Sequence, residues 1–208
     1  MTDALTAGIV VFDDVDLLDV VGPYEVLLTA SRLAARDHLA QPFIVQTLGL
    51  TDEPAEAYGG AGIRAGARLD QSRVDLLIVP GAIAIDEVLA DRDLVRAIGA
   101  ASAAARVTAS VCTGAFVLGE LGLLTGRRWT THWEDIDELA SRLGMPGERD
   151  VRWVDEGEIV TSGAVSSGIA MTLHLVHRFA GLDLAQRSAR QLDYLWIPEP
   201  AITAPDAG

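Results

Sequence analysis

Arg106-Val107-Thr108-Ala109-Ser110-Val111-Cys112-Thr113-Gly114-Ala115-Phe116 is the stretch that decides the fold. Residues 106–111 have the small and β-branched side chains of a buried strand, and residues 114–121 carry apolar residues at helical spacing. Cys112 and Thr113 lie between them, so the chain turns sharply from strand to helix there. We therefore expect Cys112 on a tight turn at the carboxyl end of a strand, with the geometry of a nucleophile elbow.

Strands and helices alternate on both sides of this turn. Short apolar runs predict strands over residues 7–12, 43–48, 74–79 and 106–111, and a two-stranded ribbon over 151–154 and 158–161. Helical spacing of apolar residues predicts helices over residues 20–35, 89–105, 114–121, 132–143, 165–179 and 183–195. The Gly- and Ala-rich residues 51–71 are expected to form short strands and turns. This alternation predicts an α/β doubly wound sheet, which binds ligands at the carboxyl ends of its strands.

The composition fits one domain with a large buried core. The chain has 208 residues, of which 50% are hydrophobic and 22% charged, and we assign residues 1–200 to this domain and residues 201–208 to a tail. A formal net charge of −14 disfavours a nucleic acid partner. The first residues carry no basic leader, and no apolar run reaches the roughly 18 residues of a membrane span. We therefore expect a cytoplasmic protein that acts on a small molecule.

Cys112 is the only cysteine of the chain. A single cysteine forms no internal disulfide and supplies no multi-thiolate zinc site, so Cys112 is either an inert buried thiol or a reactive one. If it is reactive, the helix that follows it is expected to lower the pKa of the thiol below its usual range. Spacing alone leaves both interpretations open.

Two further titratable residues, Asp19 and His132, are candidates for the site. Asp19 interrupts an apolar stretch after the first strand, where an ionised carboxylate without a partner is costly. It is either the N-cap of the first helix or a catalytic acid whose burial raises its pKa. His132 stands between Thr131 and Trp133 at the expected start of a helix, where it is either bound to the backbone or part of the site.

At these residues the chain resembles a known family, the ThiJ/PfpI superfamily of class I glutamine amidotransferase-like proteins, and within it the isonitrile hydratases. The resemblance extends over nearly the whole chain. Its motifs are residues 17–26 (LLDVVGPYEV), 79–81 (VPG), 111–126 (VCTGAFVLGELGLLTG), 130–133 (TTHW) and 191–194 (QLDY).

This resemblance implies a flavodoxin-like, mostly parallel sheet with helices on both faces, and a homodimer. It also implies Cys112 as the nucleophile, Asp19 as the acidic partner of the sulfur and Thr113 as the residue beside it. No metal ion or organic cofactor is implied. PfpI-type proteases have histidine directly after the cysteine, so Thr113 argues against a protease. A homodimer is also suggested by the apolar residues 20–24, which a monomer would leave partly uncovered.

Three positions depart from the pattern of the family. Gly81-Ala82 and Gly163-Ala164 stand where Gly-Gly pairs are common, and Ala170 stands where relatives often carry aspartate. If Ala82 had to adopt a positive φ, its backbone N–H would be displaced. The same core also forms the amino-terminal half of AraC-type regulators, but we expect no helix-turn-helix domain in these 208 residues.

The leading hypothesis is hydration of an isonitrile to an N-substituted formamide through a thioimidate on Cys112. In this scheme Asp19 exchanges protons and Thr113 positions the substrate or water. The backbone N–H of Gly81 or Thr113 stabilises developing charge, and Ala82 and His132 lie beside the substrate. One alternative is glyoxalase- or deglycase-like chemistry on small carbonyls. Another is a non-enzymatic ligand or redox sensor in which Cys112 is only oxidised.

Overall fold

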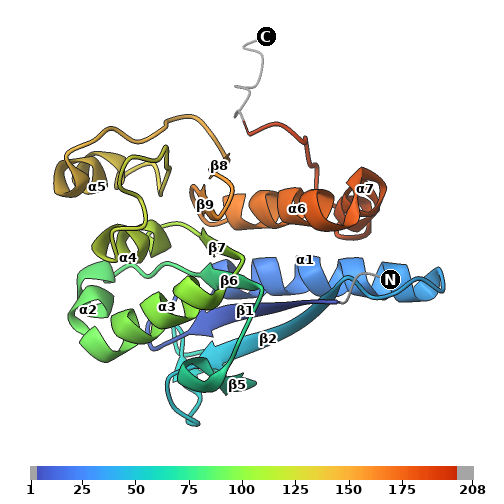
Figure 1. Ribbon diagram of the computed structural model, residues 1–208, viewed down its shortest axis with the longest axis horizontal. Helices are drawn as coiled ribbons and strands as arrows, with labels where there is room; N and C mark the ends of the chain where they lie inside the picture. Colours follow the sequence, from blue (N-terminus) through green and yellow to red (C-terminus); the bar gives the residue numbers. More distant parts are fainter. Residues whose placement is uncertain (1–3, 201–208) are drawn as a thin grey trace.

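A computed structural model describes residues 4–200 and contains a seven-stranded sheet with helices on both faces (Figure 1). The strand order is β5-β2-β1-β6-β7-β9-β8, and every neighbouring pair is parallel except β8 with β9. These strands are β1 (Leu5–Val11), β2 (Phe43–Gly49), β5 (Ala67–Arg68), β6 (Leu76–Val79), β7 (Val107–Ser110), β8 (Trp153–Asp155) and β9 (Ile159–Ser162). A separate antiparallel pair consists of β3 (Ala55–Glu56) and β4 (Gly62–Ile63).

The helices form the two outer layers. They are α1 (Leu17–Arg36), α2 (Ile85–Ala90), α3 (Arg92–Ala104), α4 (Gly114–Glu120), α5 (Ile136–Leu143), α6 (Ser167–Ala180) and α7 (Leu182–Gln191), with a short 3₁₀ helix at Leu69–Gln71. Helices α1, α6 and α7 pack against one another, and α2 packs against α3 and α4. None of the helices within residues 4–200 is long and apolar enough to cross a membrane.

The order of the strands places the crevice of the sheet between β1 and β6. From β1 the chain moves to β2 on one side, whereas from β6 it moves to β7 and β9 on the other side. Right-handed crossovers therefore put α1 on one face and α2 to α4 on the opposite face. Where the direction reverses, the loops after β1 and β6 separate and leave room for a ligand. The predicted doubly wound α/β fold is confirmed.

Strands β6 and β7 are buried along their whole length, because helices cover both faces of the parallel sheet. Strand β6 is wholly aliphatic, whereas β7 carries two buried hydroxyl residues, Thr108 and Ser110. The hydroxyl of Thr108 is hydrogen-bonded to that of Ser102 at 2.8 Å. The largest fully buried side chains of the hydrophobic core are Trp129, Phe43 and Phe116.

The ends of several helices differ from the prediction. Helix α1 begins at Leu17 because the side chain of Asp16 accepts a hydrogen bond from the backbone N–H of Leu18. The predicted helix over residues 89–105 is divided into α2 and α3, since Asp91 caps α3. Helix α7 ends at Gln191, before the predicted residue 195. The predicted tail, residues 201–208, lies outside the described residues.

Candidate active site around Cys112

Cys112 lies on a strained turn between β7 and α4. Its φ of 54° falls in the left-handed region, which costs a residue other than glycine about 1–3 kcal/mol. Residues distant in sequence hold this backbone: the N–H of Cys112 donates to the carbonyl of Gly163 at 3.0 Å, and the Thr131 hydroxyl donates to the carbonyl of Cys112 at 2.8 Å. The N–H of Ala115 also donates to the Cys112 carbonyl at 3.4 Å. The expected elbow geometry is confirmed.

Gly114 explains how α4 can begin so close to the sheet. A Cβ atom on this residue would lie 2.3 Å from the carbonyl oxygen of Val79 and 2.9 Å from that of Pro80. Atoms at such distances overlap, so only glycine allows the helix to start against the end of β6. The glycine therefore sets the sharpness of the turn that holds Cys112.

Asp19 lies in the first turn of α1 and is fully buried. Its Oδ2 accepts a hydrogen bond from the backbone N–H of Gly81 at 3.0 Å, whereas Oδ1 has no hydrogen-bond partner among the described residues. Burial raises the pKa of Asp19 to about 8, the Gly81 bond opposes this rise, and the charge of Asp16 adds to it. Asp19 therefore holds a proton at neutral pH. The alternative role as N-cap is wrong, because Asp16 caps this helix.

The expected lowering of the Cys112 pKa is wrong. Burial raises the pKa of this thiol, and the charges of Asp19, Asp16 and Asp135 raise it further, while a hydrogen bond from the Thr113 backbone lowers it. The side chain lies in the interior, with Cys112 only 7% exposed, so loss of hydration outweighs the short helix behind it. The resting site thus holds a thiol and a carboxylic acid, and nucleophilic attack requires that the thiol proton be removed.

The loop after β6 is tied to the elbow through Thr113. The Thr113 hydroxyl donates to the carbonyl of Ala82 at 2.8 Å and accepts from the N–H of Ala82 at 2.9 Å. At Gly81 a Cβ atom would lie 2.5 Å from the Thr113 hydroxyl, so this loop can approach the elbow only with glycine there. The φ of Ala82 is not positive, so alanine in place of the second glycine of the Gly-Gly pair causes no backbone strain.

These contacts leave one backbone donor for the sulfur. The N–H groups of Gly81 and Ala82 are bound to Asp19 and Thr113 respectively. The backbone of Thr113 bonds to the sulfur instead. Of the two predicted donors, Gly81 and Thr113, it is therefore Thr113 that faces the reacting atom, and the Thr113 hydroxyl braces the neighbouring loop.

His132 lies in the turn before α5 rather than at the start of a helix. Its side chain is 20% exposed, and Nδ1 lies 3.3 Å from Oδ2 of Asp135. The preceding residue, Thr131, bonds to Cys112, so the fold brings this histidine to the edge of the elbow. Asp135 was not predicted from the sequence. The only local signal for it is its position three residues after His132. Within residues 4–200 no group of three His, Cys, Asp or Glu side chains could hold a metal ion.

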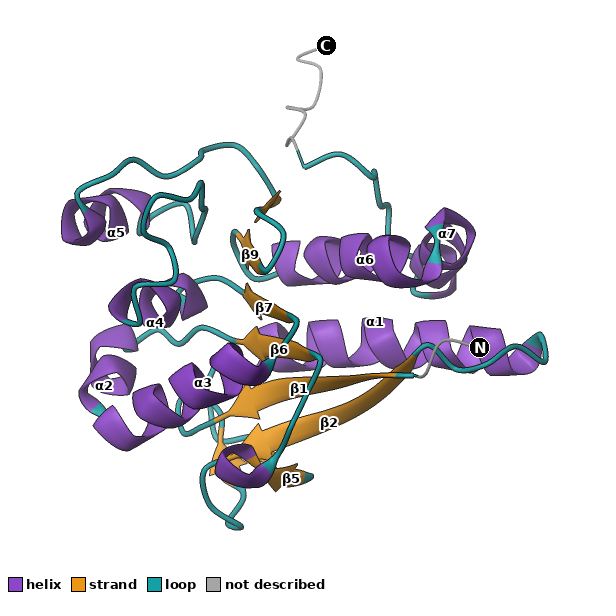
Figure 2. Ribbon diagram, viewed as in Figure 1, coloured by secondary structure: helices purple, strands orange, loops and turns teal. Residues whose placement is uncertain are grey.

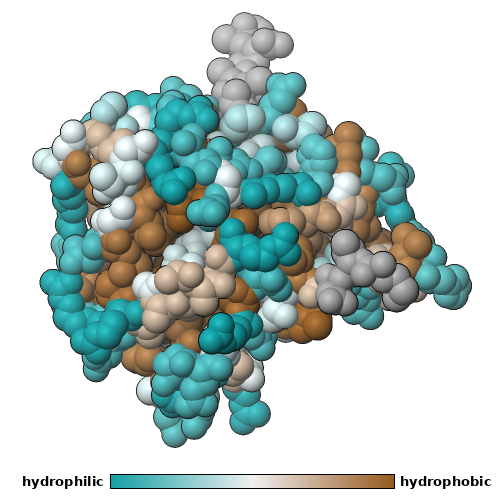
Figure 3. All heavy atoms as spheres, viewed as in Figure 1, coloured by the Kyte–Doolittle hydropathy of each residue, from teal (hydrophilic) through white to brown (hydrophobic). Residues whose placement is uncertain are grey.

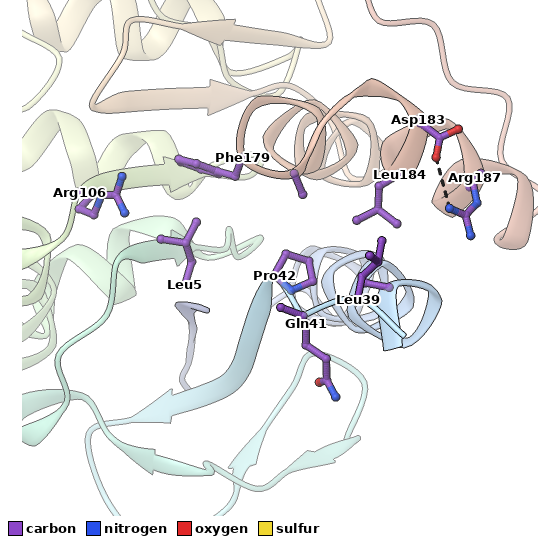
Figure 4. Close-up of a pocket in the computed structure, with 12 residues that line it drawn as sticks. Leu5, Leu39, Gln41, Pro42, Arg106, Phe179, Asp183, Leu184 and Arg187 are labelled. Atoms are coloured by element: carbon purple, nitrogen blue, oxygen red, sulfur yellow. Dashed lines mark hydrogen bonds and ion pairs between the residues drawn. The ribbon is translucent and has the colours of Figure 1, made fainter. Parts of the chain in front are cut away.

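The side chains of Cys112 and Asp19 are buried, and a separate cavity lies at the opposite end of the strands. That cavity of about 500 Å³ is formed at the amino ends of β1 and β7, by residues that include Leu5, Arg106, Phe179 and Leu184 (Figure 4). Neither Cys112 nor Asp19 lines it. Exposed apolar side chains lie next in sequence to the residues of the site: Leu18 and Val21 are near Asp19 in α1, Ile83 follows Ala82, and Trp133 follows His132.

Known proteins match this chain in sequence and in fold. It is 34% identical over 206 residues to the isonitrile hydratase of Pseudomonas putida, a match that covers 98% of this chain and 84% of that protein. It is 27% identical over 191 residues to the HTH-type transcriptional regulator GbdR of Pseudomonas aeruginosa, covering 90% of this chain but only 50% of the regulator.

Two solved structures share the fold at low sequence identity. A ThiJ/PfpI family protein from Pseudomonas syringae superposes with a TM-score of 0.81 and 22% identity, over 95% of this chain and 78% of that one. DJ-1beta from Drosophila melanogaster superposes with a TM-score of 0.75 and 17% identity, over 93% of this chain and 100% of that one. The sequence profile of the DJ-1/PfpI family matches residues 6–178. With its strained cysteine elbow and this match over most of its length, the chain belongs to the DJ-1/PfpI family.

Proposed function

We propose that this protein hydrates an isonitrile to an N-substituted formamide, with Cys112 as the nucleophile and Asp19 as the proton-transfer group. The observation that carries the proposal is the pairing of a thiol on a strained elbow with a buried carboxyl group that holds its proton near pH 7. The likeness to the isonitrile hydratase of Pseudomonas putida supports the choice of substrate.

The chemistry of the substrate fits this pair of groups. The terminal carbon of an isonitrile, R–NC, must gain both a nucleophile and a proton. In the first step the sulfur of Cys112 bonds to that carbon. Asp19 gives its proton to the carbon and receives the thiol proton, which leaves the carboxyl group as it began. The product is the thioimidate R–N=CH–S–Cys112, which contains all the atoms of the isonitrile and the thiol.

Hydrolysis of the thioimidate completes the reaction. Water adds to the thioimidate carbon, with Asp19 exchanging protons, for which a pKa of about 8 is well suited. The carbon–sulfur bond then breaks, and the sulfur leaves and regains a proton while the Thr113 N–H stabilises its charge. The sum is R–NC plus water giving R–NH–CHO, with Cys112 restored.

A homodimer is part of the proposal. Val20, in the stretch expected to be uncovered, is in fact buried, but Leu17, Leu18, Val21 and Leu28 are each 36–41% exposed on one face of α1. Apolar side chains also reach the surface in several places on the side of the molecule shown in Figure 3. A second copy would cover the α1 face and help close the site. Light scattering that gives only the 22.0 kDa monomer at micromolar concentration would contradict it.

One assay tests the function against its alternatives. Purified protein is mixed with a small alkyl or aryl isonitrile, and formation of the formamide is followed. The same protein is then given methylglyoxal, and lactate is followed. Formamide production that depends on Cys112 is the expected result. Lactate instead would favour the glyoxalase-like alternative, and turnover of neither substrate would favour a ligand or redox sensor.

A further inference from the structure

The segment after α7 reaches back toward the site. Residues 192–200, called the C-terminal strap, run over the outer side of α6 (Figure 2). The indole N–H of Trp196 donates to the carbonyl of Ala170 at 3.1 Å, and the carbonyl of Pro200 accepts from the N–H of Arg152 at 2.6 Å. These bonds attach the strap both to α6 and to the residue before β8.

Tyr194, on this strap, contacts the loop over residues 163–166. Its hydroxyl donates to the carbonyl of Ser166 at 3.3 Å and accepts from Nη1 of Arg152 at 3.2 Å. The carbonyl of Arg152 in turn accepts from the N–H of Gly163 at 3.0 Å. Arg152 therefore holds the loop at both ends, directly at Gly163 and through Tyr194 at Ser166.

This loop provides one of the hydrogen bonds that hold the strained backbone of Cys112. The carbonyl of Gly163 receives the backbone N–H of Cys112. A left-handed residue other than glycine persists only where its surroundings hold it. Ser166 is exposed, and its carbonyl accepts from the backbone N–H of Ile169 at 3.2 Å as well as from Tyr194, so the Tyr194 bond adds a long-range attachment to this end of the loop.

We propose that Tyr194 is a positioning residue, which acts with Arg152 to fix the loop over residues 163–166 and thereby the strained backbone of Cys112. Tyr194 touches neither Cys112 nor a reacting atom. Its effect on turnover rests on the proposed function, but its effect on the accessibility of Cys112 does not. This role also accounts for the last motif noted in the sequence, residues 191–194, which no catalytic step uses.

The experiment compares Tyr194→Phe with the wild-type protein. The change removes both hydrogen bonds of the hydroxyl and keeps the ring. Loss of such a bond loosens the loop, so the rate of Cys112 alkylation by iodoacetamide at pH 9 should rise about 3- to 10-fold. With an isonitrile as substrate, kcat should fall by a similar factor while KM changes little, because the reacting groups and not the substrate contacts are displaced.

Two further variants sharpen the test. Arg152→Ala should reproduce the faster alkylation, and the double variant should show no larger effect, because both residues belong to one network. Leu195→Ala is the matched control: this side chain is on the same strap and is 85% exposed, so the alkylation rate should stay at the wild-type value.

An unchanged alkylation rate in Tyr194→Phe, or effects of the two single variants that add in the double variant, would overturn the proposal. If Tyr194→Phe lost its near-UV circular dichroism, Arg152→Ala would provide the same test. Alkylation involves no isonitrile, so failure of the proposed hydration would leave this measurement valid.

Discussion

Asp19 and Asp155 are both removed from water, Asp19 fully and Asp155 partly, yet the fold shifts their pKa values in opposite directions. Asp155, at the end of β8, has side-chain oxygens 2.7 Å from Nε2 of His174 and 3.3 Å from Nη1 of Arg178. Burial would raise the pKa of Asp155, but the bonds from His174 and Gly157 and the charge of Arg178 together lower it. Asp155 is therefore an ionised, paired carboxylate.

Asp19 forms no ion pair with a cation within residues 4–200. One backbone N–H, from Gly81, is its hydrogen-bond donor, and its other oxygen is unpartnered among the described residues. Burial thus dominates and keeps the group protonated. The difference shows that nearby cations and hydrogen bonds keep one buried carboxyl group ionised, whereas burial without a cation keeps the other protonated. Perturbed groups of the second kind are typical of reactive sites.

The largest expected effect is at Cys112. Cys112→Ala should abolish hydratase activity, and Cys112→Ser should remove nearly all of it, because an alcohol is a far weaker nucleophile and no strong base lies beside it. Stability should fall by only about 1 kcal/mol, so both variants should remain folded. Steady-state formamide assays and thermal unfolding measure the two quantities. Wild-type turnover in either variant would exclude the cysteine mechanism.

The comparison predicts opposite results for two matched substitutions. Asp19→Asn should lower kcat by about 10²- to 10⁴-fold, because the amide keeps the shape but cannot exchange a proton. Asp155→Asn should leave kcat within about two-fold but cost about 1–2 kcal/mol of stability, because its charged hydrogen bonds are weakened. The same formamide assay and urea unfolding are applied to both variants. If Asp19→Asn kept the wild-type rate, Asp19 would be structural as well.

The dependence of stability on pH should also differ in sign. Folded Asp19 keeps its proton up to about pH 8, whereas the unfolded chain loses it near 3.8, so rising pH across this range favours unfolding. The free energy of unfolding of Asp19→Asn, relative to that of the wild type, should therefore rise by up to about 1.4 kcal/mol per pH unit between these two pKa values. Asp155, whose pKa is lowered, stabilises the fold above 3.8, and this contribution is lost as pH falls through its folded pKa. Urea unfolding of both variants from pH 3 to 9 checks the two signs.

Local sequence was enough to predict the sheet and the elbow. Residues 74–79 are mostly aliphatic and residues 106–111 are mostly small or β-branched, both of which indicate buried strands, and the change from strand to helix pattern at Cys112-Thr113 indicated the close turn. The start of the first helix was predicted wrongly, because Asp19 was the only cap considered and Asp16 caps the helix instead. The contact that places Asp19 in the site, its hydrogen bond from the N–H of Gly81, joins residues 62 positions apart, so no local pattern predicts it.

The sequence could not show how burial acts on the thiol. A helix after Cys112 predicts a lowered pKa, but the loss of hydration depends on packing by distant loops. Likewise, Tyr194 reaches Ser166 over 28 residues and Arg152 over 42 residues, so no local pattern predicts their contact. The features that the sequence did not predict depend on contacts between distant residues. They include the electrostatic interactions that set the protonation state of Cys112 and Asp19.

The smallest expected effect concerns the titration of Cys112 by iodoacetamide. The midpoint of the alkylation rate should lie above 9.0, the ordinary value for a cysteine, because burial and the charge of Asp19 raise the pKa of this thiol. Asp19→Asn removes that charge, so the midpoint should move to lower pH. Asp155→Asn should leave it unchanged, since the charge of Asp155 is not among those that act on this thiol. A midpoint near 7 in the wild type would mean that the thiol is activated in the resting protein, and Asp19 would then not be needed as the acceptor of its proton.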